Sequence, residues 1–343
     1  MINLYSDTQS FPTDAMRRAI TSAEVGDEQS KSDPTTNLLE EKVAELLGKE
    51  ASVFLPTGTM CNLIAVAINT KPGDVIAMDS MGHIVRSETG GAGVVSNVLT
   101  DLIDGDRGHF TALQLEERLE VSSRYRPPTS LVCLEQTHNF AGGTVWPLDR
   151  WDEVCSLAFD KGIAVHVDGA RLFNAQVASG ISVKKWASGA NTVWIDFTKG
   201  LGAPMGACLA GNKESIDRAW LWKHRLGGAM RQSGLMAAAA IHALDHHIER
   251  LADDHRRASR LADALIDLGF DVTNPETNMV YFDPIQCGIR VETLLSHLAE
   301  YEIRMSAVGN RIRAVTHIDI SDKDIDVVID AFGEISKTAK DEI

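Results

Sequence analysis

From residue 51 onward, the chain alternates between short apolar runs and stretches with helical periodicity. Turn residues bound the apolar runs, which therefore predict buried strands at 51–56, 75–79, 130–137, 163–170 and 192–199. The segment from Pro147 to Gly162 has an early proline, apolar positions about four apart and a closing glycine, which together predict a helix. Strands that alternate with helices in this way predict a parallel sheet wrapped by helices.

The pattern changes after an alanine-rich segment, residues 235–251, which predicts a helix. Shorter strands, mixed with helical segments, are then predicted at 269–273, 278–283 and 311–318. This mixture is typical of an α+β domain. We therefore expect a large domain over residues 1–244 and a smaller C-terminal domain over residues 245–343.

The composition argues against several classes of protein. A chain of 343 residues with 44% hydrophobic residues can bury a large core, which disfavours a disordered or purely structural protein. The net charge of −15 disfavours nucleic acid and acidic membranes as partners. The first residues lack the pattern of a signal peptide, and the longest apolar stretch, "LMAAAAIHAL", is too short to cross a bilayer. These features predict a cytoplasmic protein without a membrane partner.

The cysteines and histidines predict no metal site. The five cysteines are scattered without a C-x-x-C pair, so they indicate core thiols in a reducing compartment rather than disulfides or a zinc site. His242 and His246 have the spacing of metal ligands on a helix, but no carboxylate or cysteine partner can be identified for them.

Polar residues with chemical potential follow the ends of predicted strands. Asp168 ends one strand, Arg171 lies on the loop beyond it, and Lys199 lies at the end of the next predicted strand, 31 positions after Asp168. Thr57-Gly58-Thr59 lies between a strand and a helix, where free backbone N–H groups favour an anion. Each feature has an ordinary alternative: a lysine pointing to water, a local ion pair, or a capped helix. Together, an amine, an acid and a phosphate site are what pyridoxal 5'-phosphate requires.

A series of longer motifs resembles one known family. The segments "SDT", "FLPTGTMCN", "HIVRSETGG", "LEQTHNFAGGTV", "VDGARLFNA", "TKGLGAPMGA", "GGAMRQSG" and "RAVTH" occur in the order found in low-specificity threonine aldolases. These are pyridoxal phosphate enzymes with the aspartate-aminotransferase fold, fold type I. The resemblance covers nearly the whole chain. It implies an α/β large domain with a mainly parallel seven-stranded sheet, a small α+β domain, and a homo-oligomer, a dimer of dimers with shared active sites.

The resemblance also implies roles for residues that would bind the cofactor. Lys199 would bind the cofactor aldehyde, Gly58 and Thr59 its phosphate, and Asp168 its ring nitrogen. His83 would stack on the pyridine ring.

Other residues are matched to the substrate and to the neighbouring subunit. Ser6, Arg171 and Arg313 would hold the substrate carboxylate, and Arg171 would also contact the cofactor. Arg231 would reach a cofactor phosphate from a neighbouring subunit, and His138 would lie near the substrate hydroxyl.

The implied reaction is cleavage of a β-hydroxy-α-amino acid to glycine and an aldehyde. Candidates for the base that removes the hydroxyl proton are His83, His138 or a water held by them. The alternatives are another reaction on the same cofactor, namely β-elimination, racemisation or biosynthetic aldol condensation, or a homologue without catalytic activity. The sequence departs from the family at Ser30-Lys31-Ser32, where relatives commonly have tyrosine, glycine and glutamate. Lys31 would favour a substrate with a negative or polar tail.

Overall fold

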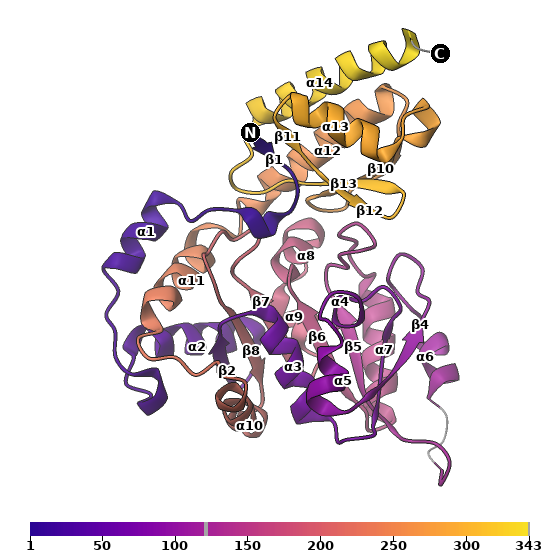
Figure 1. The fold of residues 1–343 in the computed structure, drawn as a ribbon. Helices are drawn as coiled ribbons and strands as arrows, with labels where there is room; N and C mark the ends of the chain where they lie inside the picture. Colours follow the sequence, from indigo (N-terminus) through magenta and orange to yellow (C-terminus); the bar gives the residue numbers. More distant parts are fainter. Residues whose placement is uncertain (120–122, 342–343) are drawn as a thin grey trace.

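The computed structural model describes residues 1–119 and 123–341 (Figure 1). At its centre is a seven-stranded sheet with the order β2-β8-β7-β6-β5-β3-β4. Its strands are β2 (Ala51–Leu55), β3 (Val75–Asp79), β4 (Leu99–Ile103), β5 (Thr129–Glu135), β6 (Ala164–Gly169), β7 (Thr192–Asp196) and β8 (Ala207–Gly211). β8 is antiparallel to β2 and β7, whereas the neighbouring strands from β7 to β4 pair in parallel. The predicted, mainly parallel sheet is confirmed.

Helices cover both faces of the sheet (Figure 1). The helices of this part of the chain are α1 (Asp14–Thr21), α2 (Pro34–Leu47), α3 (Gly58–Asn69), α4 (His83–Arg86), α5 (Gly91–Ser96), α6 (Ala112–Arg118), α7 (Leu148–Asp160), α8 (Leu172–Ser179), α9 (Val183–Ala187), α10 (Lys213–Arg225) and α11 (Gly234–His246). In β5, Val132 and Leu134 pack into the core on one face, and Leu131 and Cys133 pack on the other. Burial on both faces requires apolar residues at successive positions, which explains the continuous apolar runs.

The C-terminal part of the chain has its own sheet and core. Its antiparallel sheet has the order β12-β13-β10-β9. The elements are α12 (Leu251–Asp267), β9 (Asp271–Thr273), β10 (Met279–Asp283), α13 (Val291–Glu300), β12 (Ser306–Val308), β13 (Arg311–Val315) and α14 (Asp322–Asp341). Phe270, Phe282 and Phe332 pack edge to face in this core, with ring centroids 5.5 to 5.7 Å apart.

The first residues of the chain join this C-terminal unit. β1 (Ile2–Asn3) pairs in parallel with β11 (Ile303–Arg304), and Leu4 is buried in the same core. Figure 1 shows the N-terminus beside these elements. Short 3-10 helices follow β1 and recur later, at η1 (Asp7–Gln9), η2 (Glu28–Ser30) and η3 (Ile285–Cys287). The boundary between residues 244 and 245 stays a prediction.

The apolar pattern did not predict β4 or β8. β4 is an edge strand with the half-exposed sequence "LTDLI", and β8 is built mainly of small residues. The single helix predicted over 235–251 is wrong, because α11 ends at His246 and α12 begins only at Leu251. His247 lies in this interruption and its Nδ1 donates to the backbone oxygen of Leu201 at 2.7 Å. Within the described residues, no helix combines the length and apolar character needed to cross a membrane.

Candidate active site

A cavity of about 700 Å³ lies where the carboxyl end of the large sheet faces the C-terminal unit. Parallel strands bring their carboxyl ends to one edge, so side chains that follow β6 and β7 meet there. Of the predicted site residues, the cavity is lined by Ser6, Gly58, Thr59, His83, Arg171, Lys199 and Arg313. Asp168, His138 and Arg231 lie outside this lining, each for a different reason.

The start of α3 forms one end of the cavity. Thr57 caps the helix, because its side chain accepts from the backbone N–H of Met60 at 3.2 Å. Gly58 packs against the face of β7, where an added Cβ would lie 2.2 Å from a ring carbon of Trp194. A glycine is therefore required for the helix to begin this close to the sheet. The first N–H groups of a helix lack partners within it, so Gly58 and Thr59 present an anion site to the cavity.

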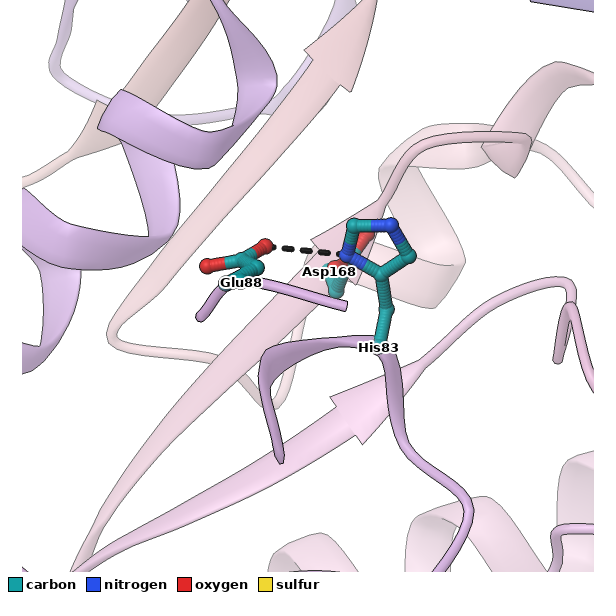
Figure 2. A group of neighbouring side chains, drawn as sticks. All are labelled: His83, Glu88 and Asp168. Carbon is teal, nitrogen blue, oxygen red and sulfur yellow. Dashed lines mark hydrogen bonds and ion pairs between the residues drawn. The ribbon is translucent and has the colours of Figure 1, made fainter. Parts of the chain in front are cut away.

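Asp168 lies at the end of β6 in a buried hydrogen-bond network (Figure 2). Its Oδ2 accepts from Asn62 Nδ2 at 2.8 Å, and its Oδ1 accepts from the backbone N–H of Ala170 at 3.1 Å. Asn62 Nδ2 also donates to Glu88 Oε1 at 2.7 Å, and Glu88 Oε1 lies 2.9 Å from His83 Nδ1. Asp168 borders a smaller cavity that it shares with His83.

This network makes His83 a stronger proton acceptor. Burial opposes the charged ring, but the hydrogen bond to Glu88 and the nearby carboxylates of Asp168 and Glu135 outweigh it and raise the pKa of His83. Burial, together with the charge of Asp168, raises the pKa of Glu88. Sequence reasoning missed Glu88, although it lies five residues after His83 in the motif "HIVRSETGG".

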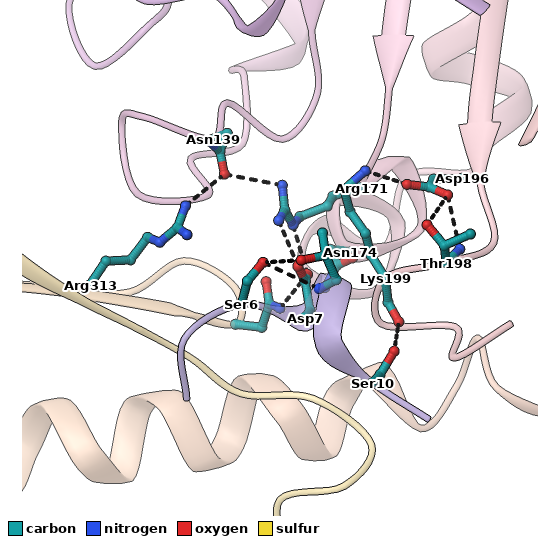
Figure 3. Close-up of polar contacts among 12 residues, drawn as sticks. Ser6, Asp7, Ser10, Asn139, Arg171, Asn174, Asp196, Thr198, Lys199 and Arg313 are labelled. Atoms are coloured by element: carbon teal, nitrogen blue, oxygen red, sulfur yellow. Dashed lines mark hydrogen bonds and ion pairs between the residues drawn. The ribbon is translucent and has the colours of Figure 1, made fainter. Parts of the chain in front are cut away.

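Arg171 is buried and paired with a buried acid (Figure 3). Its Nε donates to Asp7 Oδ2 at 2.8 Å, and its Nη2 donates to Asp7 Oδ1 at 2.7 Å. Burial alone would raise the pKa of Asp7, but the Arg171 guanidinium holds it well below its usual range. This two-point contact fixes the plane of the guanidinium and leaves Nη1 for another partner.

Arg171 and Arg313 share one acceptor at the cavity wall (Figure 3). Each donates from Nη1 to Asn139 Oδ1, both at 3.3 Å. The backbone N–H of Asn139 in turn donates a hydrogen bond to Glu135 Oε1 at 2.8 Å. A single oxygen between two guanidinium groups is the arrangement that a substrate carboxylate would require, and Asn139 was not predicted from the sequence.

Lys199 lies on the turn after β7 rather than in the strand. Its Nζ contacts Asp196 Oδ2 and lies 5.5 Å from the centroid of the Trp194 ring. Its backbone oxygen accepts from Ser10 Oγ at 2.9 Å, which ties the turn to the N-terminal segment. The amine therefore enters the cavity from the β7 side.

His138 is not brought to the cavity. Its buried Nε2 lies 3.1 Å from Asp79 Oδ1, and its Nδ1 accepts from the backbone N–H of Ala141 at 3.3 Å. Burial opposes protonation, but the carboxylates of Glu135 and Asp79 raise the pKa of His138. With both nitrogens engaged, this ring fixes the loop after β5 and has no free atom for a substrate.

Arg231 and Lys31 lie away from the cavity of their own chain. The side chain of Arg231 is 64% exposed, and its Nη1 lies 3.2 Å from Asp27 Oδ2. Lys31 ends η2 with a left-handed backbone, φ 56°, and is exposed. The two segments are tied together, because the backbone N–H of Glu28 donates to the oxygen of Arg231 at 2.9 Å.

The cavity fits pyridoxal phosphate. It combines an amine at Lys199 with an anion site at the start of α3 that only glycine can form at position 58. The buried acid Asp168 borders the smaller cavity, and His83 lines both cavities. Half-exposed His83 lies between the acid and the open cavity, where a ring could stack on it. The donor set therefore agrees with each chemical part of this cofactor.

Comparisons with known proteins point to the same family. The chain matches the beta-eliminating lyase family over residues 3–286. It is 38% identical over 325 residues to low specificity L-threonine aldolase of Escherichia coli K12, covering 94% of this chain and 95% of that one. It is 37% identical over 343 residues to probable low-specificity L-threonine aldolase 2 of Arabidopsis thaliana, covering 97% of each.

Solved structures agree in fold. Threonine aldolase of Leishmania major aligns with a TM-score of 0.84 at 19% identity and covers 98% of this chain and 100% of that one. The predicted fold class, fold type I, is confirmed. The family match likewise confirms the predicted cofactor, pyridoxal phosphate, and the predicted class of enzyme, a lyase. This chain belongs to the beta-eliminating lyase family, within its group of low-specificity L-threonine aldolases.

Proposed function

We propose that this lyase cleaves threonine, allo-threonine and related β-hydroxy-α-amino acids between Cα and Cβ to give glycine and an aldehyde. The observation that carries the proposal is the acceptor shared by Arg171 and Arg313 at the wall of a cavity that also holds Lys199. The relatives named above support the substrate class. When bound, pyridoxal phosphate supplies an electron sink for the bonding electrons of Cα.

Arg171, Arg313 and Ser6 would hold the substrate carboxylate. A carboxylate oxygen can replace Asn139 Oδ1 between the two Nη1 groups, because both guanidinium groups already point to that position. Asp7 keeps Arg171 in place during the exchange. With the carboxylate held here and the substrate nitrogen near Lys199, rotation about Cα is restricted. Orientation then decides which bond of Cα is broken.

His83 would accept the proton of the β-hydroxyl at Nε2. Its Nδ1 is already hydrogen-bonded to Glu88, which leaves Nε2 as the nitrogen available to the cavity. The raised pKa of His83 strengthens it as a base. His138 would act indirectly by holding the loop that carries Asn139, and a water held by His83 is the remaining candidate for the base.

We infer that the active protein is a homo-oligomer, a dimer of dimers, in the cytoplasm. Arg231 is exposed and outside its own cavity, as a residue donated to a neighbour would be. Lys31 would accompany it, because η2 is bound to the segment that carries Arg231. The buried thiols of Cys61, Cys133, Cys155 and Cys208 support a reducing compartment.

The test is product analysis with the purified protein and pyridoxal phosphate. We expect glycine and the matching aldehyde from threonine or allo-threonine, and no glycine from the Lys199→Ala variant. Arg313→Ala should raise KM more than it lowers kcat, because the carboxylate is bound in the ground state as well. Formation of an oxo acid or of racemised substrate without glycine would replace the aldolase proposal with β-elimination or racemisation.

A further inference from the structure

Asp196 is a buried carboxylate beside Lys199. It is the last residue of β7 and is buried, with its backbone paired to Ala207 of β8. Its Oδ2 contacts Lys199 Nζ, as Figure 3 shows. The carboxylate is thus held at the end of an interior strand of the sheet, next to the amine on which the proposed function depends.

The other oxygen of Asp196 is held independently of the lysine. Oδ1 accepts from the backbone N–H of Thr198 at 2.9 Å and from its hydroxyl at 2.8 Å. The carboxylate therefore keeps its position when the lysine side chain moves. The Lys199 side chain has several rotatable bonds, whereas the Asp196 carboxylate is held by Thr198.

Other charged groups near Lys199 are already engaged. Asp7 is near enough to interact with Lys199, but both of its oxygens are held by Arg171. Arg171 interacts with Asp196 over a longer range, yet its Nε and Nη2 point to Asp7. Trp194 offers the amine only a ring face. Asp196 is therefore the acid with an oxygen available to the ammonium.

We propose that Asp196 is the positioning residue of Lys199. It pairs with the ammonium form of the lysine and holds Nζ on the β7 side of the cavity whenever this nitrogen is not bonded to the cofactor. This inference rests on the proposed function. If the substrate nitrogen takes the place of Lys199 on the cofactor, the bond from the cofactor to Nζ would break as the bond to the substrate nitrogen forms. With one hydrogen kept on the bonded nitrogen, two protons would pass from the substrate ammonium to Nζ, which leaves as an ammonium, and no electrons would be gained or lost. Asp196 then pairs with the new charge and keeps the lysine from competing with the substrate nitrogen.

The rival explanation is purely structural. The contacts of Asp196 with Thr198 form a turn that asparagine makes equally well. Asp196→Asn should therefore keep the turn and remove only the charge. A second uncharged variant, Asp196→Ser, tests whether the result depends on the new amide.

The experiment measures how fast formaldehyde and a borane reductant methylate Lys199 at pH 8 in the full chain freed of cofactor. Only the uncharged amine reacts, so the rate reports the loss of its proton. We expect Asp196→Asn and Asp196→Ser to accelerate methylation about tenfold, as expected when a buried charge-assisted hydrogen bond is removed. Recovery of the visible absorbance band after pyridoxal phosphate is added back shows that the variants are folded.

The control is an exposed pair of the same type. Lys185 Nζ lies 2.8 Å from Asp152 Oδ2, and both side chains are about half exposed. Asp152→Asn should change methylation of Lys185 by less than threefold, because solvent screens such pairs. An acceleration of threefold or less at Lys199 in both Asp196 variants overturns the proposal. Because the measurement needs neither cofactor nor turnover, it can succeed even if glycine release fails.

Discussion

Replacing Asp7 with asparagine would leave Arg171 buried without its counter-ion. The two side chains are nearly inaccessible to solvent and share two hydrogen bonds of 2.7 and 2.8 Å. Asparagine has the same shape and can still accept from Asn278, whose Nδ2 lies 3.1 Å from Asp7 Oδ2. The main loss is therefore electrostatic. Removing one partner of a buried ion pair costs about 3 to 5 kcal/mol, because the other charge stays desolvated.

The exposed pair of Asp27 and Arg231 is the matched control. It joins the same residue types, but the side chain of Arg231 is 64% exposed. Asp27→Asn should lower the free energy of unfolding by less than about 1 kcal/mol, and asparagine can still cap η2. Urea unfolding of the full chain at pH 7 measures both variants. Equal losses in Asp7→Asn and Asp27→Asn would refute the claim that burial of Arg171 makes its partner essential.

The pH dependence of Asp7→Asn provides a second check. Arg171 holds the pKa of Asp7 well below its usual range, so the carboxylate stays charged in the folded protein at mildly acid pH. Its contribution to stability is fully present above the pKa of the unfolded chain, about 3.9, and is lost as pH falls through the lower pKa of the folded state. The difference in unfolding free energy between the wild type and Asp7→Asn should be constant from about pH 5 upward and should shrink below about pH 4.

Three other predictions concern residues outside the cavity lining. Burial raises the pKa of Glu40 from 4.5 to about 7, so its stabilising contribution is fully present below about pH 4.5 and is lost as pH rises through 7. Glu40→Gln should therefore remove a fall of up to about 3 kcal/mol in the free energy of unfolding between pH 5 and 8. Equal slopes of unfolding free energy against pH in wild type and variant would contradict this. Mixing Arg231→Ala chains with Lys199→Ala chains should restore some activity if sites are shared, whereas no recovery after proven subunit exchange would confine Arg231 to its own chain. Lys31→Ala should lower kcat/KM about tenfold for 3-hydroxyaspartate but not for threonine, and an unchanged ratio would remove Lys31 from substrate selection.

The positions of Asp168, Arg171 and Lys199 could be predicted because local sequence determines them. Each lies in the last residues of a buried strand or just after it, and neighbouring parallel strands end at one edge of the sheet. Gly58 and Thr59 were predictable for the same reason, since a strand and a helix flank them. In these cases the order of strands and helices along the chain is enough to predict that these residues lie at the carboxyl edge of the sheet.

Contacts between distant segments could not be predicted in this way. Asn139 Oδ1 lies between Arg171 and Arg313 only because β13 of the C-terminal unit faces the loop after β5. The sequence likewise places His138 beside Asn139 but does not determine rotamers, and here the ring points to Asp79. Such contacts depend on how separate elements pack, which no local pattern records.

The central claim is that Lys199 holds pyridoxal phosphate in this cavity, and reduction of the loaded enzyme tests it most directly. Borohydride would fix the cofactor to the amine that carries it, and peptide mass spectrometry would then locate the modified residue. We expect the modification on the peptide that contains "DFTKGLGAP", at Lys199, and its loss in Lys199→Ala. Stoichiometric modification of a different lysine in the wild-type enzyme would contradict the claim.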